Sequence, residues 1–254
     1  MSVYDIFRPM DLDRAKGAST GFCNGIPGEQ RYNEETPLFA SAILRLCYQV
    51  ANGKPAKILD FGCGPGRLAK AILDSDKDGV AVNEYEATDI SYTMRAFARM
   101  NVNDKRFVTT HAALLGPVKG GRQPNILLVS FVLQHMPAVR LYPAIRWMWD
   151  VSRDRDFDFT CTRLVVVNSK QRLAVTKDGF VDDGPLGVDV DDELSRGFEE
   201  CGQLFTDDEM TTSPVVNALM RGQLQHTAKV YRPLEAWRHI IESDRKEFDK
   251  KCPD

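Results

Sequence analysis

Short apolar runs alternate along this chain with longer segments whose apolar residues recur at helical spacing. The apolar runs are typical of buried strands, and turn residues follow them. Strands that alternate with helices indicate a mostly parallel sheet that is covered by helices on both faces. The predicted strands are residues 58–61, a strand that ends near Asp89, and residues 106–110, 126–130, 164–168 and 227–231.

Capping residues add to the helix prediction. Thr36 is a good N-cap and Pro37 is a favourable first helical residue, so we expect a helix to begin there. Thr206 and Glu209 have the T-x-x-E spacing of a capping box, which predicts the start of a late helix. The other predicted helices are residues 67–73, 92–99 and 137–152.

Composition and charge exclude several classes of protein. The 254 residues suffice for one large α/β domain, and a formal net charge of −3 predicts no general attraction to nucleic acid. The six cysteines are scattered without a C-x-x-C pair, which argues against a zinc site and favours a reducing compartment. We find no signal-peptide apolar region and no run long enough to span a bilayer, so we expect a cytoplasmic protein with no membrane partner.

The strongest candidate for chemistry is the segment ILDFGCGPGRLA, residues 58–69, in which a strand leads into a helix through glycines. Gly62 and Gly64 lack a Cβ atom, so the backbone can adopt positive φ and approach a ligand closely. The start of the helix then presents free N–H groups. Dinucleotide-binding turns have the spacing G-x-G-x-x-G, whereas this turn has G-x-G-x-G with Asp60 two residues before it.

This segment resembles motif I of the Rossmann-like, class I S-adenosylmethionine-dependent methyltransferases, and the resemblance extends over residues 36–170. It implies an α/β fold with a doubly wound, mostly parallel sheet of seven strands and helices on both faces. It also implies S-adenosylmethionine as the cofactor. The glycine spacing disfavours a dehydrogenase. The resemblance assigns cofactor binding at this turn to Asp60, Gly62, Gly64 and Gly66.

Asp89 lies about one βαβ unit after the glycines, where Rossmann-like folds place an acid that accepts the ribose hydroxyls. The segment ATDIS, residues 87–91, also resembles motif II of the family. We therefore assign the ribose contact to Asp89, with Ile90 beside the cofactor. Glu84 and Glu86 are the alternatives if the register of the strand is shifted.

His111 and Ala112 stand where many members of the family have an acidic residue that binds the adenine amino group. Two interpretations are open, because adenine could be held by the histidine ring or by a backbone N–H group. The resemblance implies further cofactor contacts by Tyr32, Ser130, Phe131 and Val132.

The segment SFVLQHMP, residues 130–137, resembles the corresponding segment of small-molecule methyltransferases. It lacks the Asn-Pro-Pro-Tyr, Asp-Pro-Pro-Tyr and Pro-Cys sequences of DNA methyltransferases. We therefore expect methyl transfer to an oxygen or nitrogen atom of a small molecule. A nucleic-acid or protein methyltransferase and a non-catalytic S-adenosylmethionine-binding subunit are the alternatives, and the oligomeric state has no sequence signal.

His135 is the candidate general base, since histidine titrates near neutral pH. Its alternative role is to order the loop through a hydrogen bond to the backbone.

The chain divides into four predicted parts. Residues 1–35 form an N-terminal arm, 36–170 the cofactor-binding core, 176–226 an insertion and candidate substrate lid, and 227–254 a late strand with a charged tail. Residues 176–209 are rich in acids, but their spacing matches no metal-ligand loop, so we predict a solvated surface and no metal site.

Overall fold

The computed structural model describes residues 28–111, 123–136, 138–152, 162–169, 171–176, 179–185, 190–221 and 226–235. Their main sheet contains the strands β1 (Ala56–Phe61), β2 (Val82–Asp89), β3 (Phe107–His111), β4 (Ile126–Ser130), β5 (Arg163–Ser169), β8 (Phe198–Gln203) and β9 (His226–Pro233). A separate hairpin consists of β6 (Gln171–Thr176) and β7 (Gly179–Pro185).

The seven strands of the main sheet lie in the order β3-β2-β1-β4-β5-β9-β8. The first five strands of this order are parallel, and β9 runs antiparallel to both of its neighbours. The predicted mostly parallel, seven-stranded Rossmann-like fold is therefore confirmed. The strand order reverses between β1 and β4, which is the point where doubly wound sheets bind ligands at the carboxyl ends of their strands.

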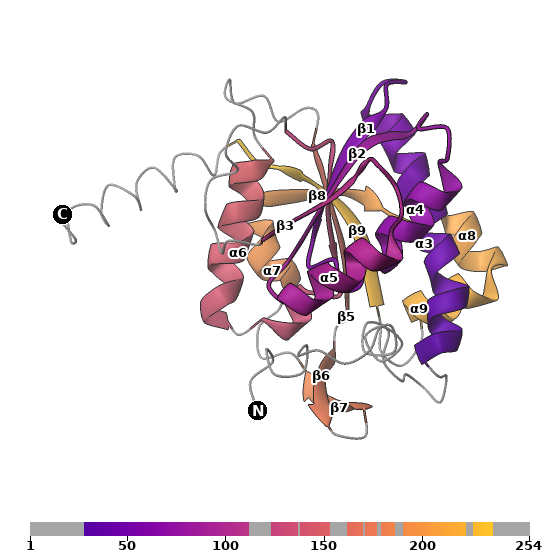
Figure 1. Cartoon of the computed structure of the whole chain (residues 1–254). Coiled ribbons are helices and arrows are strands. Elements are labelled where there is room, and N and C mark those ends of the chain that lie inside the picture. The colour runs from indigo at the N-terminus through magenta and orange to yellow at the C-terminus, as the bar shows by residue number, and fades with distance from the viewer. Residues whose placement is uncertain are drawn as a thin grey trace.

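Helices cover both faces of this sheet, as Figure 1 shows with α3 and α4 on one side and α6 and α7 on the other. β4 explains the continuous apolar runs of the sequence, because Leu127 and Leu128 point to opposite faces and both are completely buried. The helices are α3 (Gly28–Val50), α4 (Arg67–Ser75), α5 (Tyr92–Asn101), η1 (Leu133–His135, a 3₁₀ turn), α6 (Ala138–Val151), α7 (Val190–Ser195), α8 (Asp207–Thr212) and α9 (Pro214–Arg221).

The predicted start of the first helix at Thr36 is wrong, because α3 begins at Gly28 and contains Pro37 in its interior. Proline cannot donate the hydrogen bond that the carbonyl of Asn33 would accept. Asn33 and Pro37 are both exposed, so water can replace that bond. The capping box at Thr206 is confirmed, but the helix that it opens ends one residue before Ser213, and α9 begins anew at Pro214.

Residues 190–203 form α7 and β8, which belong to the helical layer and to the sheet, so the interpretation of 176–209 as a solvated insertion is wrong for this part. Val190, Leu194 and Phe198 are buried against α6, and β8 forms one edge of the sheet. The β6–β7 hairpin instead stands apart from the sheet, next to η1. A lid function for any part of residues 176–226 stays a prediction.

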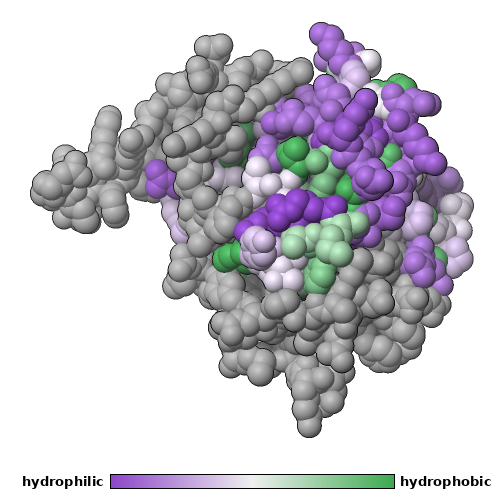
Figure 2. Space-filling view, in the orientation of Figure 1, coloured by the Kyte–Doolittle hydropathy of each residue, from purple (hydrophilic) through white to green (hydrophobic). Residues whose placement is uncertain are grey.

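The described surface is largely polar on the face that Figure 2 shows, where hydrophobic residues form small separate patches. None of the helices in the described ranges combines the length and the apolarity that crossing a bilayer requires.

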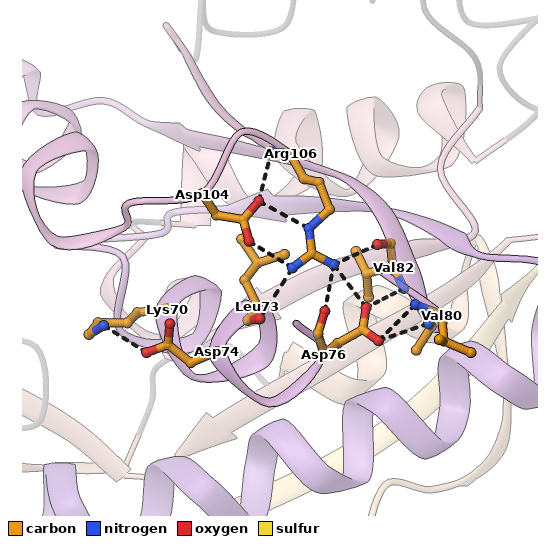
Figure 3. Close-up of polar contacts among 9 residues, drawn as sticks. Lys70, Leu73, Asp74, Asp76, Val80, Val82, Asp104 and Arg106 are labelled. Carbon is orange, nitrogen blue, oxygen red and sulfur yellow. Dashed lines mark hydrogen bonds and ion pairs between the residues drawn. The ribbon is translucent and has the colours of Figure 1, made fainter. Parts of the chain in front are cut away.

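A saturated charge cluster fixes the amino-terminal ends of β2 and β3, away from the carboxyl ends (Figure 3). The Arg106 guanidinium contacts the Asp76 carboxylate at 3.0 Å and the Asp104 carboxylate at 2.7 Å. It also donates hydrogen bonds to the backbone carbonyls of Leu73, Asp76 and Val82. The Asp76 carboxylate accepts the N–H groups of residues 80–82 as well, so this cluster is a structural element.

Substituting Arg106 with methionine should destabilise the fold by about 3–5 kcal/mol, because it leaves the buried Asp76 carboxylate without its cation. Lys70→Met is the matched control, since the Lys70–Asp74 pair is 2.7 Å long but exposed, and its loss should change stability by less than about 0.5 kcal/mol. Urea denaturation measures both variants. Equal midpoints for the two would show that the Arg106 cluster does not anchor these strands.

Candidate active site

The turn between β1 and α4 is bonded to the end of β2. The N–H groups of Gly62 and Cys63 both donate to the Thr88 carbonyl, at 2.8 and 2.9 Å. Gly62 has a φ of 81°, and a Cβ atom there would lie 2.3 Å from Cγ2 of Val132. Only a residue without a side chain therefore fits at position 62, and the turn lies directly against the loop that follows β4.

Gly64 differs from Gly62 in its surroundings. It also has a positive φ, 54°, but a Cβ atom there would meet no described atom within 4 Å. Its N–H group donates to Oδ2 of Asp89 at 2.9 Å. The turn is thus closed on the side of Val132 and open above Gly64, which is the arrangement that close approach of a ligand requires.

Asp89 is placed beside the turn, as the sequence predicted. Its Oδ1 atom accepts the N–H group of Ser91 at 2.8 Å, and Arg95 donates to its backbone carbonyl. Ser91 caps α5 by accepting the N–H group of Met94, so Asp89 is not the cap. Burial raises the pKa of Asp89, and the two N–H donors counteract this shift.

The alternative acids lie further back in β2 and are engaged elsewhere. Glu84 and Glu86 contact the buried ammonium group of Lys57, at 2.9 and 3.6 Å. Asp89 is therefore the carboxylate that the structure brings to the glycines.

Asp60 lies in β1, two residues before Gly62, and is buried in the interior. Its side chain is buried and accepts a hydrogen bond of 2.9 Å from the Tyr85 hydroxyl. Burial raises the pKa of Asp60 to about 7, while the Tyr85 hydrogen bond and the charge of Arg67 lower it. Arg67 also lies 4.0 Å from the buried Glu35 carboxylate of α3. A contact between Asp60 and the cofactor stays a prediction.

Cys63, between these glycines, is a packing residue. Burial raises the pKa of its thiol well above the ordinary value, so the thiol stays protonated at neutral pH and is a poor nucleophile.

The end of β4 carries two unusual groups. The Ser130 hydroxyl oxygen is buried, with no hydrogen-bond partner within the described part of the chain. Phe131 has a φ of 57°, although a bulky residue there costs about 1–3 kcal/mol. Its ring packs edge-on against Phe39 and His226, with centroid distances of 6.3 and 5.2 Å. Sequence reasoning missed His226, because its contact with Phe131 joins two segments far apart in the chain.

The remaining predicted residues lie at the same edge or outside the described part. Ile90 is 38% exposed next to Asp89, and His111 ends β3 in register with Asp89. The backbone of Tyr32 lies in α3 and that of His135 in η1, while Ala112 lies outside the described residues. The side chains of Tyr32, His111 and His135 are also outside the described part. The assignment of these contacts stays a prediction.

Comparison with known proteins points to one family. Residues 59–165 match a family model described as a methyltransferase domain. A search of curated protein sequences returned no significant match.

Two solved structures share the fold. A TehB-like S-adenosylmethionine-dependent methyltransferase from Corynebacterium glutamicum superimposes with a TM-score of 0.50 and 14% identity, over 81% of this chain and 97% of that one. A putative S-adenosylmethionine-dependent methyltransferase from Listeria monocytogenes gives a TM-score of 0.50 and 10% identity, over 77% and 98%. At these identities, the two similarities support the fold alone.

The doubly wound sheet and the glycine turn at its switch point define a class I S-adenosylmethionine-binding fold. Residues 59–165 match a methyltransferase domain, which indicates that the protein is an S-adenosylmethionine-dependent methyltransferase with S-adenosylmethionine as its cofactor. The site fits this cofactor. The space beside Gly64 is free of described atoms. Each carboxylate oxygen of Asp89 accepts one N–H group and has a further lone pair for a ribose hydroxyl. The Ser130 hydroxyl also has hydrogen-bonding capacity that the described residues do not use.

Gly64→Ala should weaken binding of S-adenosylhomocysteine by about tenfold or more, because the added methyl group occupies the open side of the turn. Gly53→Ala is the matched control, since Gly53 also has a positive φ, 76°, and open space around it, but lies away from the site. Both variants should lose about 1–2 kcal/mol of stability from the left-handed backbone. Calorimetric titration separates them, and equal affinities would mean that the cofactor does not approach Gly64.

Asp60 should make the stability of the fold depend on pH. Its folded pKa, about 7, lies above the ordinary value of 3.8, so the folded protein holds the proton more tightly than the unfolded chain. This contribution is complete below pH 3.8 and is lost as the pH rises to about 7. Asp60→Asn keeps an acceptor for Tyr85 and should flatten that part of the profile of unfolding free energy against pH. An unchanged slope would show that Asp60 is ionised throughout.

Proposed function

We propose that this methyltransferase acts on an oxygen or nitrogen atom of a small molecule. The observation that carries the proposal is that the two arginines beside the glycine turn are buried and face groups of the protein itself. Arg67 and Arg95 are only 5% and 6% exposed, and they face Glu35 and the backbone carbonyl of Asp89. A nucleic-acid methyltransferase needs accessible cations near its site to neutralise phosphates.

Ion pairs elsewhere in the described part support the same proposal. Lys229 contacts Asp191 at 2.8 Å and Glu200 at 3.0 Å, and Arg232 contacts Glu199 at 2.7 Å. These cations are neutralised within the protein, and the whole chain has a formal net charge of −3. Such an electrostatic balance favours a neutral or cationic acceptor over a polyanion.

We further infer that the β6–β7 hairpin forms a wall of the acceptor site. Its first strand precedes the predicted lid segment, residues 176–226, and its second strand lies within that segment. Its strand β6 lies next to η1, which directly follows the β4 loop at the carboxyl edge of the sheet. A cover at this edge would keep water away from the reacting atoms.

The cofactor supplies a methyl group that is already activated by its attachment to a sulfonium. The residues of the chain then have to align the acceptor and exclude water. A base is needed only for an acceptor that must lose a proton, and His135 remains our candidate because η1 follows β4. We also propose a cytoplasmic location, which the free thiols of Cys47, Cys63 and Cys201 support.

The proposal is tested by incubating the protein with methyl-labelled S-adenosylmethionine and three fractions of a cell extract, containing small molecules, proteins or nucleic acids. Label should enter the small-molecule fraction, and S-adenosylhomocysteine should suppress the transfer. Asp89→Ala is the control variant, since losing hydrogen bonds to a charged acceptor should weaken cofactor binding by about tenfold. Label that enters only proteins or nucleic acids would refute the small-molecule acceptor.

A further inference from the structure

We infer that His226 is a positioning residue of the cofactor site. Its ring, together with that of Phe39, holds Phe131 in place, and Phe131 in turn fixes Val132 against Gly62. The inference deepens the proposed function, because it concerns the same site. It assigns a role to β9, a strand that none of the predicted site residues occupies.

The conformation of Phe131 requires an explanation of this kind. One other non-glycine residue of the described ranges has a positive φ, namely Asn52 at 50°. Asn52 follows the end of α3, where asparagine commonly adopts the left-handed region. A phenylalanine rarely does so, and such a residue persists only where its surroundings determine the backbone.

Contacts from three distant segments determine the backbone of Phe131. Its N–H group donates to the Val167 carbonyl at 2.7 Å, which extends the pairing of β4 with β5 by one residue. Its ring then meets Phe39 of α3 and His226 of β9, both in edge-on geometry. Phe39 and His226 are almost completely buried, so these contacts belong to the packed interior.

His226 reaches this position because β9 runs antiparallel to β5. His226 is the first residue of β9, so it lies at the carboxyl edge of the parallel strands, in register with Ser169. A histidine at the start of β9 is thus brought to the same edge as the glycine turn.

The link to the cofactor runs through the residue after Phe131. Val132 lies so close to Gly62 that a Cβ atom on the glycine would be 2.3 Å from it. The N–H group of Gly62 is bonded to Thr88, next to Asp89. A shift of Phe131 would therefore displace Val132 and loosen the turn that binds the cofactor.

Three variants separate positioning by the ring from general stabilisation. His226→Phe keeps an aromatic ring, and His226→Asn keeps polar atoms but removes the ring. Phe205→Leu is the matched control, because Phe205 packs against Phe39 at 5.2 Å but has no described ring contact with Phe131. Calorimetric titration with S-adenosylhomocysteine needs no methyl acceptor, so its result is independent of the proposed acceptor class.

We expect His226→Phe to bind S-adenosylhomocysteine like the wild type and His226→Asn to bind it about three- to tenfold more weakly. Phe205→Leu should lower the thermal midpoint without changing the affinity. Wild-type affinity in a folded His226→Asn protein would overturn the inference. So would equal weakening by His226→Phe and His226→Asn, which would assign the effect to the polar atoms of the imidazole.

A double-mutant cycle, titrated at a temperature below the thermal midpoint of every variant, tests the same link independently. Phe131→Asn leaves the left-handed backbone accessible but removes the ring. In that background, His226→Asn should cause no further loss of affinity, because its contact is already absent. Additive losses would show that His226 acts independently of Phe131 and would overturn the inference.

Discussion

The absence of a side chain at residue 62 is the constraint on which the cofactor site depends. Val132 occupies the volume that a Cβ atom would need, so the loops after β1 and β4 can meet directly. Hydrogen bonds from Gly62 and Cys63 to Thr88 connect the end of β2 to the same point. The ends of three neighbouring strands at the switch point are thereby linked, while a Cβ atom on Gly64 would meet no described atom within 4 Å.

The two edges of the sheet use polar groups in opposite ways. At the amino-terminal edge, Arg106 satisfies Asp76 and Asp104, and no acceptor of that cluster needs a ligand to complete it. At the carboxyl edge, Ser130 and Asp89 keep hydrogen-bonding capacity that the described residues do not use fully. Spare capacity in a buried polar group is costly unless a ligand completes it, which is why it points to a binding site.

The sequence was sufficient to predict features that are set by a few neighbouring residues. The glycine turn, the placement of Asp89 and the apolar strand β4 are of this kind. β8 was missed because Phe198 is its one buried residue in a run of exposed ones, so no alternation marks it as a strand. The early start of α3 was missed because Pro37 normally begins a helix. The partners of Asp60 and Phe131 are set by tertiary packing, to which periodicity is insensitive.

The position of β9 between β5 and β8 means that the sheet is completed out of chain order. Residues 198–203 are synthesised before residues 226–233, yet β8 pairs with β9 and with no other strand of the main sheet in the described part. Until β9 inserts, β8 has no strand beside it, and a strand in that state is prone to pair with other chains. The exposed carboxylates of Glu199 and Glu200 lie on this strand, and their mutual repulsion between copies would protect the nascent chain from aggregation.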